Sequence, residues 1–318
     1  MLIRRNGEHW EALAPAKLNL FLEIHGSRDD GFHELDMLMV PIALYDSLVF
    51  SLTADAEIQL TARWAMASRC MATLPAAEDN LIVRALQLLR RKIRERDSGF
   101  SQGLRVDLVK RIPSAAGLGG ASSDAATALV VANELWQAGF DRHALAEMAL
   151  QIGSDVPFFL TATPARCRGR GEKIDLIESG SSLHVVLVKP RVGLSTADVF
   201  SEYQRQGVSD VVEIDSALAA FGKGQAGSVG RNLHNRLVES AMKVAPTLKK
   251  LQKDLADLHL LGTQMTGSGS TFFAICHNAC HAQATAKTLS ARGYDSVFNT
   301  RTLSRCAFSP AWFEKIQT

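Results

Sequence analysis

The chain has 318 residues, of which 47% are hydrophobic and 21% charged, a composition that allows a sizeable core and favours two domains over one. Lys and Arg number 35 against 33 Asp and Glu, and this balance argues against a protein that binds nucleic acid or a membrane surface. The five irregularly spaced cysteines do not suggest a disulfide framework, and neither a secretory leader nor a membrane-spanning run is apparent, so we expect a cytoplasmic protein.

Strands and helices alternate loosely along the chain, which predicts a mixed α+β fold. A polar stretch near 175–183 suggests a boundary between a domain at 1–180 and a second domain at 181–318. The glycine-rich segment 221–230 predicts a flexible loop, and 61–79 shows no clean period. The expected elements are a strand over 104–110, a helix over 121–136 opened by Ser122 or Ser123, a helix between Asp141 as N-cap and Gly153 as C-cap, a strand over 184–190, a helix over 194–207, a helix over 245–262, a strand over 270–276, a helix over 280–293 and a strand over 295–303.

The stretch PSAAGLGGASS, residues 113–123, directly follows the first of these strands and leads into a helix. Glycines let the backbone approach a ligand, and a helix N-terminus offers unpaired N–H groups, so this arrangement favours a bound phosphate. It is not a Walker loop, because no lysine follows the glycines, and it is not a complete Rossmann fingerprint, because position 122 is serine. The competing interpretation is a small-residue turn that only lets the helix pack tightly on a sheet.

Two further clusters of small residues stand on either side of this loop, APAKLNLFLEI at 14–24 and MTGSGSTFFAI at 265–275. The order PAKLNL, PSAAGLGGASSDAA, TGSGST resembles the three motifs of the GHMP kinase superfamily, whose middle motif is the ATP-phosphate loop. The resemblance spans nearly the whole chain. It implies an α+β fold of two domains, an N-terminal domain with the ATP loop and a ferredoxin-like C-terminal domain, with the active site in the cleft between them.

Finer features resemble one branch of this superfamily, the one that acts on 4-diphosphocytidyl-2-C-methyl-D-erythritol. They are the segments RDDGFHELDMLMVPIALYD at 28–46, EDNLIVRA at 78–85, KRIP at 110–113, IGSDVPFFL at 152–160 and RGRGE at 168–172. The resemblance implies ATP-dependent phosphorylation of a hydroxyl of this cytidine-diphospho sugar alcohol to the 2-phosphate, in the non-mevalonate route to isoprenoid precursors. The alternatives are a kinase for another small alcohol, of the homoserine or mevalonate type, and a non-catalytic binding protein of the same fold.

The resemblance places Lys17 and Asp155 at the catalytic positions. Asp155 would accept or orient the proton of the substrate hydroxyl, and Lys17 would keep Asp155 ionised and stabilise charge on the transferred phosphoryl group. Each residue also has an ordinary interpretation. Asp155 precedes VPFF and could be only a helix N-cap with Pro157 in the first turn, and Lys17 could be a strand lysine that reaches the surface.

The ATP site implied by the resemblance is the backbone of the glycine loop, with Mg²⁺ as cofactor. Ser122 and Ser123 could cap the helix or contact phosphate or Mg²⁺, and the sequence does not identify the metal ligands. Asp124 is interpreted as a first-turn partner of the helix dipole. The predicted cofactor-binding residues are Pro113, Ser114, Ala115, Ala116, Gly117, Leu118, Gly119, Gly120, Ala121, Ser122 and Ser123, with Asn80 and Lys110 near the nucleoside.

For the substrate, the resemblance implies contacts from Asn19, Phe32, His33, Thr196 and Phe200. Phe32 stands where the family commonly has tyrosine. Stacking on a cytosine ring survives this change, whereas a hydroxyl hydrogen bond is lost. Thr196 and Phe200 lie four residues apart and therefore share a helix face, which could equally be a core face.

The remaining features are weaker. Loop 266–271 would line the diphosphate end of the substrate or support the ATP loop, without a catalytic role. The run CHNACH at 276–281 invites a zinc interpretation, which common zinc geometry does not favour because the run passes from a strand into a helix. We expect a small-molecule substrate, no nucleic-acid or membrane partner, and a monomer or homodimer.

Overall fold

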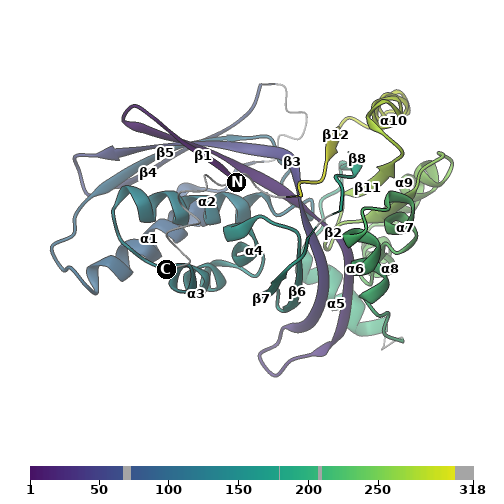
Figure 1. Ribbon diagram of the computed structural model, residues 1–318, viewed down its shortest axis with the longest axis horizontal. Helices are drawn as coiled ribbons and strands as arrows, with labels where there is room; N and C mark the ends of the chain where they lie inside the picture. The colour runs from purple at the N-terminus through teal and green to yellow at the C-terminus, as the bar shows by residue number, and fades with distance from the viewer. Residues whose placement is uncertain (67–72, 179, 207–209, 305–318) are drawn as a thin grey trace.

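The computed structural model describes residues 1–66, 73–178, 180–206 and 210–304, which form two β-sheets with helices packed on them (Figure 1). The strands of the larger sheet are β1 (Leu2–Asn6), β2 (His9–Ser27), β3 (His33–Thr53), β4 (Ile58–Trp64), β5 (Gly103–Lys110), β6 (Ala165–Gly169), β7 (Lys173–Leu176) and β9 (His234–Asn235). Their order is β1-β2-β3-β5-β4, with β6 beside β3, β7 beside β6 and β9 beside β2.

The long antiparallel hairpin of β2 and β3 connects the two halves of the molecule. β2 is buried at every position from Ala14 to Ile24 rather than at alternate positions, because both of its faces are covered. Leu22 packs in the larger core together with the helices of the N-terminal half, whereas Leu18 and Leu20 pack in a second core with residues of the C-terminal half. Lys17 therefore lies where the two halves meet.

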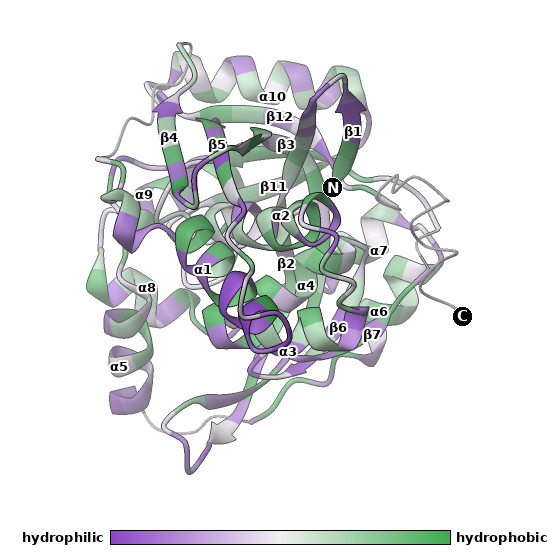
Figure 2. Cartoon of the chain, turned by 90° about the vertical axis from the view of Figure 1, so that its left-hand side faces the viewer, coloured by the Kyte–Doolittle hydropathy of each residue, from purple (hydrophilic) through white to green (hydrophobic). Residues whose placement is uncertain are grey.

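Four helices lie together against the larger sheet in Figure 1. They are α1 (Leu81–Arg94), α2 (Gly120–Leu135), α3 (Arg142–Ile152) and α4 (Val156–Thr161). α2 is buried along most of its length, because its run of small and β-branched side chains packs closely on the sheet and on α1. Figure 2 shows α2 in the middle of the molecule, largely in the colour of hydrophobic residues.

The smaller sheet consists of β8 (His184–Val188), β10 (Gly262–Met265), β11 (Phe272–Cys276) and β12 (Val297–Arg301). Its order is β10-β11-β8-β12 with antiparallel neighbours, and α10 (Ala279–Ala291) connects β11 to β12. With helices also between β8 and β10, this is the ferredoxin-like β-α-β-β-α-β arrangement. The predicted α+β fold with a ferredoxin-like C-terminal domain is confirmed.

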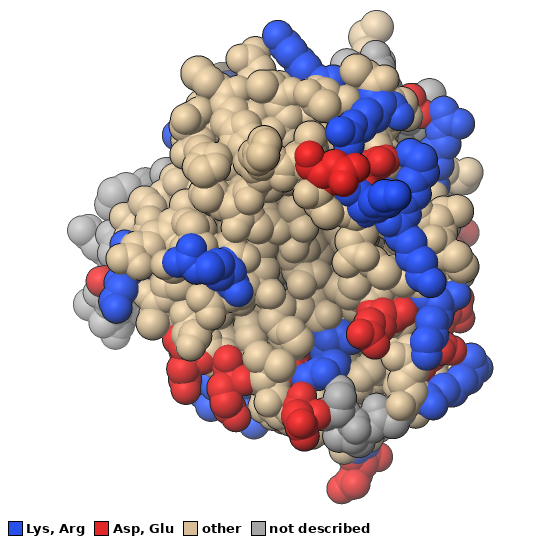
Figure 3. All heavy atoms as spheres, turned by 90° about the vertical axis from the view of Figure 1, so that its right-hand side faces the viewer, with Lys and Arg blue, Asp and Glu red and all other residues tan. Residues whose placement is uncertain are grey.

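The C-terminal half also carries α5 (Thr196–Gln206), α6 (Asp215–Gly222), α7 (Ala226–Arg231), α8 (Val238–Val244) and α9 (Leu248–Ala256). Figure 3 shows the face of this half, on which acidic and basic side chains are interspersed around the margin and uncharged residues fill the centre. No helix of the described residues is both long and apolar enough to cross a membrane.

The division of the chain at 180/181 remains a prediction. The contacts of the C-terminal half with the larger sheet include two strand pairings. β9 pairs in parallel with β2, with Phe21 opposite His234, and Ile42 forms an isolated bridge with Thr302. The two halves are therefore joined by backbone hydrogen bonds as well as by side-chain packing.

Several sequence-based assignments of elements were wrong in detail. The helix after the glycine loop is not opened by Ser122 or Ser123. It begins at Gly120, with Gly119 at the N-cap position in a left-handed conformation at φ 68°. Asp124 is consequently one turn further in than expected. The predicted loop 221–230 contains the end of α6 and all of α7 except Arg231, and the expected helix over 245–262 is limited to α9.

Other assignments were confirmed. Asp141 caps α3, because its Oδ1 accepts a hydrogen bond from Ala144 N at 2.8 Å, and Gly153 is the C-cap.

The unassigned segment 61–79 begins within β4 and ends in a 3₁₀ turn at Ala77–Asp79, while 67–72 lies outside the described residues. In the run CHNACH, Cys276 is buried on β11, and His281 Nδ1 accepts from His277 N at 3.3 Å.

Candidate active site

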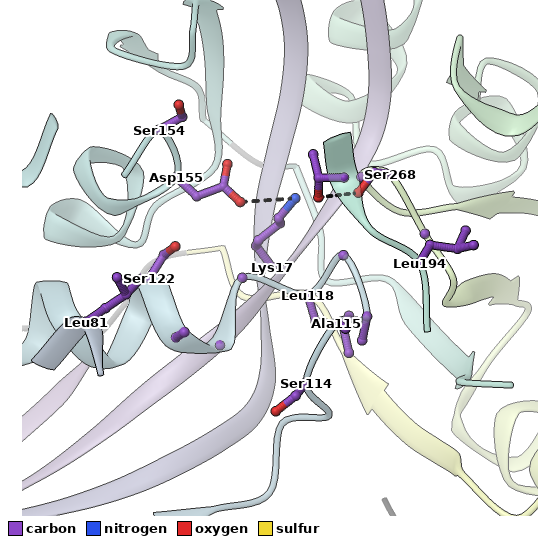
Figure 4. A pocket seen from close by; sticks show the side chains of 18 of the residues that line it. Lys17, Leu81, Ser114, Ala115, Leu118, Ser122, Ser154, Asp155, Leu194 and Ser268 are labelled. Atoms are coloured by element: carbon purple, nitrogen blue, oxygen red, sulfur yellow. Dashed lines mark hydrogen bonds and ion pairs between the residues drawn. The ribbon is translucent and has the colours of Figure 1, made fainter. Parts of the chain in front are cut away.

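A cavity of about 1040 Å³ lies between the two halves, lined by segments far apart in the sequence. They include the middle of β2, the glycine loop, the start of α4, the exposed side of α5 and the loop 267–269 (Figure 4). All of the predicted catalytic, cofactor-binding and substrate-binding residues line it, with the exception of Ser123, which is buried beneath. The structure therefore brings together residues that the sequence analysis assigned to a single site.

The three small-residue motifs meet at one junction in this cavity. Lys17 N donates to Leu118 O at 3.0 Å, which joins β2 to the glycine loop. Asn19 N donates to Thr266 Oγ1 at 3.1 Å, and Thr266 Oγ1 donates to Gly117 O at 3.2 Å. These bonds fix the relative positions of all three motifs through main-chain groups of β2 and the glycine loop and through the Thr266 hydroxyl, and the Lys17 side chain lines the cavity.

Lys17 and Asp155 point toward one another in the centre of the cavity (Figure 4), with 3.6 Å between Lys17 Nζ and Asp155 Oδ2. The Lys17 side chain is 4% exposed, and its Nζ also donates to Asn19 Oδ1 at 2.5 Å. Asp155 stands at the N-cap position of α4 but makes no capping hydrogen bond. Its carboxylate is directed at the lysine instead, so the simple capping interpretation of Asp155 does not describe the structure.

The glycine loop wraps closely around this centre. Gly117 has φ 70°, and a Cβ there would lie 2.1 Å from Thr266 O. Gly119 has φ 68°, and a Cβ there would meet the Phe159 ring at 2.8 Å. No side chain caps the N-terminus of α2. The N–H groups of its first turn can therefore donate to a ligand. A helix N-terminus of this kind suits a phosphate.

A buried charge cluster supports the loop from below. Lys110 Nζ donates to Asp46 and, at 2.7 Å, to Asp124 Oδ2. Asp46 Oδ1 also accepts from Ile112 N at 2.9 Å, which ties the end of β5 to β3. Burial, opposed by Lys110 and assisted by Asp46, raises the pKa of Asp124 to about 7. Burial lowers the pKa of Lys110, but Asp124 and Asp46 outweigh it and leave this pKa above its usual value.

Aromatic side chains form the opposite end of the cavity. The rings of His33 and Phe200 are 4.8 Å apart and tilted by 34°. Phe32 is 44% exposed, and the Arg170 guanidinium lies 3.6 Å from the centre of its ring. Burial lowers the pKa of His33, which favours the neutral imidazole, and its Nε2 lies 3.4 Å from the amide nitrogen of Gln204. A half-exposed ring beside a neutral imidazole can stack on a planar base and hydrogen-bond to its edge.

The helix face predicted for Thr196 and Phe200 lies toward the cavity. Thr196 Oγ1 is hydrogen-bonded to Ser268 Oγ at 2.9 Å. This contact joins α5 to the third motif. Phe200 is half-buried and packs against the larger core as well as lining the cavity, so it has both of the roles that the sequence left open.

Some residues of the site were missed by the sequence analysis. Asn235 Nδ2 donates to both Met265 O and Gly267 O at 2.8 Å and so holds the third motif in place. Asp46, Arg170 and Gln204 were also not identified individually. Arg170 and Asp46 lie within segments that carry the family resemblance, RGRGE and the end of 28–46, and those segments were the available signal.

Comparison with known proteins gives the family of the chain. Residues 80–163 match the model of the GHMP kinases N-terminal domain, and residues 217–295 match that of the GHMP kinases C-terminal domain. The chain is 40% identical to a protein of Pelotomaculum thermopropionicum, over 83% of this chain and 88% of the relative. The chain belongs to the GHMP kinase family, which consists of ATP-dependent kinases.

The names of these relatives specify one enzyme of the family. The Pelotomaculum protein is named 4-diphosphocytidyl-2-C-methyl-D-erythritol kinase, as is a protein of Shouchella clausii that is 35% identical over 93% of this chain and 95% of its own length. A crystal structure of 4-(cytidine 5'-diphospho)-2C-methyl-D-erythritol kinase superimposes with a TM-score of 0.73 at 31% identity, and covers 92% of this chain and 98% of that chain.

Proposed function

We propose that this protein transfers the γ-phosphoryl group of ATP to the 2-hydroxyl of 4-diphosphocytidyl-2-C-methyl-D-erythritol, a step in the synthesis of isoprenoid precursors. One observation carries the proposal. The Lys17–Asp155 pair lies between the glycine loop at one end of the cavity and the Phe32, His33 and Phe200 rings at the other. A phosphate donor and a base-bearing alcohol can therefore meet at the pair.

The loop 113–122 is proposed to hold the phosphates of ATP through its backbone N–H groups and the N-terminus of α2. Asn80 and Lys110 line the same side of the cavity. Their polar groups are already engaged, since Asn80 Oδ1 accepts from Ile82 N at 3.0 Å and Lys110 binds two carboxylates. A contact with the nucleoside from either residue remains a prediction.

Mg²⁺ is proposed as the cofactor. It is usually held by one or two carboxylates together with the nucleotide phosphates. The Ser122 hydroxyl and the Asp155 carboxylate line the cavity beside the glycine loop and supply oxygen donors of this kind. The ion would neutralise charge on the phosphates.

Asp155 is proposed to accept or orient the proton of the attacking hydroxyl. Lys17 Nζ lies 3.6 Å from this carboxylate and places a cation beside the phosphate loop, where negative charge gathers during transfer. Asn19 positions Lys17 through the bond to Nζ. Phosphoryl transfer needs little more than such positioning of the reactants and neutralisation of the phosphate charge.

At the other end, Phe32 and Phe200 are proposed to stack on the cytosine and His33 to read its edge, with Thr196 closing the site. The neutral imidazole suits this role because it offers both a donor and an acceptor. A cytoplasmic location and a monomeric or homodimeric state remain proposals from the sequence alone.

The test is ADP release by the purified protein with MgATP and each of three alcohols: the cytidylyl substrate, homoserine and mevalonate. Release with the cytidylyl compound alone supports the proposal. Release with another alcohol would retain the kinase chemistry and overturn the assignment of the aromatic end. Measurable ATP binding without release in any mixture would favour a binding protein of this fold.

A further inference from the structure

The basic residues that line the cavity differ in whether they are already paired. Among the described residues they are Lys17, Lys110 and Arg170. Lys17 faces Asp155, and Lys110 binds Asp46 and Asp124. No ion pair or side-chain hydrogen bond of Arg170 occurs among the described residues, and its Nε is buried without a partner. A buried, unpartnered guanidinium donor is unfavourable unless a ligand completes it.

The neighbouring carboxylates are engaged elsewhere. Arg170 lies in the turn between β6 and β7, where its own backbone N donates to Glu172 Oε2 at 2.5 Å. Asp30, on the hairpin that carries Phe32, is bound by Arg28 at 3.2 Å, and the charge of Arg170 acts on it without forming an ion pair among the described residues. The guanidinium rests instead on the ring of Phe32. Stacking of this kind fixes the guanidinium plane and leaves its N–H groups directed outward from the edge.

Arg170 also stands between the two ends of the cavity. On one side it covers Phe32. On the other side the next residue, Gly171, packs so closely on Ser154 that a Cβ there would lie 3.1 Å from Ser154 O. Ser154 directly precedes Asp155. In the proposed substrate, the anionic diphosphate connects the cytidine to the sugar alcohol and must span this same interval.

We propose that Arg170 binds the diphosphate of the cytidylyl substrate and is a specificity-determining residue for it. The inference rests on the proposed function and adds a residue to it. A guanidinium presents paired N–H donors that match phosphate oxygens, and such charge-assisted bonds are strong. The contact with Phe32 would couple recognition of the diphosphate to the position of the ring that stacks on the base.

The test compares R170M with wild type, using steady-state kinetics with the cytidylyl substrate and competitive inhibition by cytidine and by CDP. We expect R170M to raise KM for the substrate and the inhibition constant of CDP by about 10- to 100-fold. We expect kcat, KM for ATP and the inhibition constant of cytidine to change by less than about threefold. R168M is the matched control, because Arg168 lies in the same hairpin and is exposed and paired with Asp175; it should behave as wild type.

R170K keeps the charge but not the paired donors, so it guards against a folding defect and should bind CDP more tightly than R170M and more weakly than wild type. Equal weakening of cytidine and CDP in R170M would mean that Arg170 only supports Phe32, and would overturn the inference. An unchanged KM in R170M would also overturn it. If the wild type itself releases no ADP with the cytidylyl substrate, the proposed function fails instead.

Discussion

The two ends of the cavity are built differently. At the reaction end, Lys17 is 4% exposed, and main-chain groups of β2 and the glycine loop are hydrogen-bonded to each other and to the Thr266 hydroxyl of the third motif. At the base end, Phe32 is 44% exposed and the contacts are between side chains, such as the 4.8 Å approach of the His33 and Phe200 rings. Phosphoryl transfer depends on fixed positions, whereas recognition of a large substrate needs an open mouth that the ligand completes.

This difference also separates what is general from what is specific. Backbone groups and glycines form the phosphate cradle, and they place no demand on the nature of the alcohol. The side chains around Phe32 determine which alcohol is bound. Changes at the reaction end should therefore lower turnover, and changes at the base end should raise KM for the alcohol alone.

The largest effect is expected for D155N at the reaction end. The amide keeps the size of the side chain but cannot accept a proton, so we expect kcat to fall by at least about 1000-fold. Binding of ATP without Mg²⁺, measured by calorimetry, should be nearly unchanged. Because Asp155 makes no capping bond, the thermal stability should also stay close to that of wild type.

Asp141 provides the opposite control, since it does cap a helix through Ala144 N. D141A should lose about 1 kcal/mol of stability and keep its turnover. Unchanged kcat in D155N would remove Asp155 from the mechanism.

The next largest effect is expected for G117A, which tests the backbone junction. A Cβ at Gly117 would lie 2.1 Å from Thr266 O at a φ of 70°, so the loop must move away from the third motif. We expect kcat/KM for ATP to fall by about 100-fold or more. G139A has a similar positive φ with nothing within 4 Å of the added Cβ, and should cost stability without lowering kcat/KM. Equal kinetics in the two variants would contradict the junction.

A smaller effect is expected at the base end. F32A and F200A each remove a stacking surface, and we expect KM for the cytidylyl substrate to rise about 10-fold in each, with KM for ATP unchanged. L52A is the control. Leu52 is 42% exposed, similar to the 44% of Phe32, but it lies near the other end of the strand that begins at His33. A fall in kcat at unchanged KM would mean that the rings act on the chemistry and not on binding.

The smallest effect concerns stability and is expected for Asp124, in the charge cluster beneath the glycine loop. Its carboxyl has a pKa raised from 3.8 to about 7 by burial. The folded state therefore binds a proton more tightly than the unfolded state, and this group's contribution to stability declines as the pH rises from about 4 to about 7. D124N should gain stability relative to wild type across this window, by up to a few kcal/mol, in urea unfolding. D107N, on the exposed side of β5, is the control, and its free energy of unfolding relative to wild type should not change with pH in this window. A difference between D124N and wild type that is the same at every pH would contradict the raised pKa.

Local patterns in the sequence predicted much of this site. The small-residue loop between a strand and a helix indicated a phosphate cradle, and the family resemblance brought in Lys17, Asp155 and Phe32. The start of α2 was misassigned because the serines are good caps in isolation, whereas Gly119 at positive φ lets the helix begin earlier. The helix α7 was missed because the glycines of 221–230 have low helix propensity. Burial of Val229 in the second core outweighs this propensity.

Long-range partners could not be read from local patterns. Lys110 and Asp46 are 64 residues apart, and Asn235 supports a loop 30 residues away. The placement of Arg170 on Phe32 depends on β6 pairing with β3. Such contacts follow from the topology of the sheet, and no spacing in the sequence reports them.

The most direct test of the account is whether the two ends act on one molecule. We would compare kcat/KM for the cytidylyl substrate with that for 2-C-methyl-D-erythritol 4-phosphate, which presents the same hydroxyl without the cytidine. Binding energy at Phe32, His33 and Arg170 should position the hydroxyl at Asp155, so the account predicts a loss of at least about 1000-fold for the shorter alcohol. Similar values for the two alcohols would contradict it.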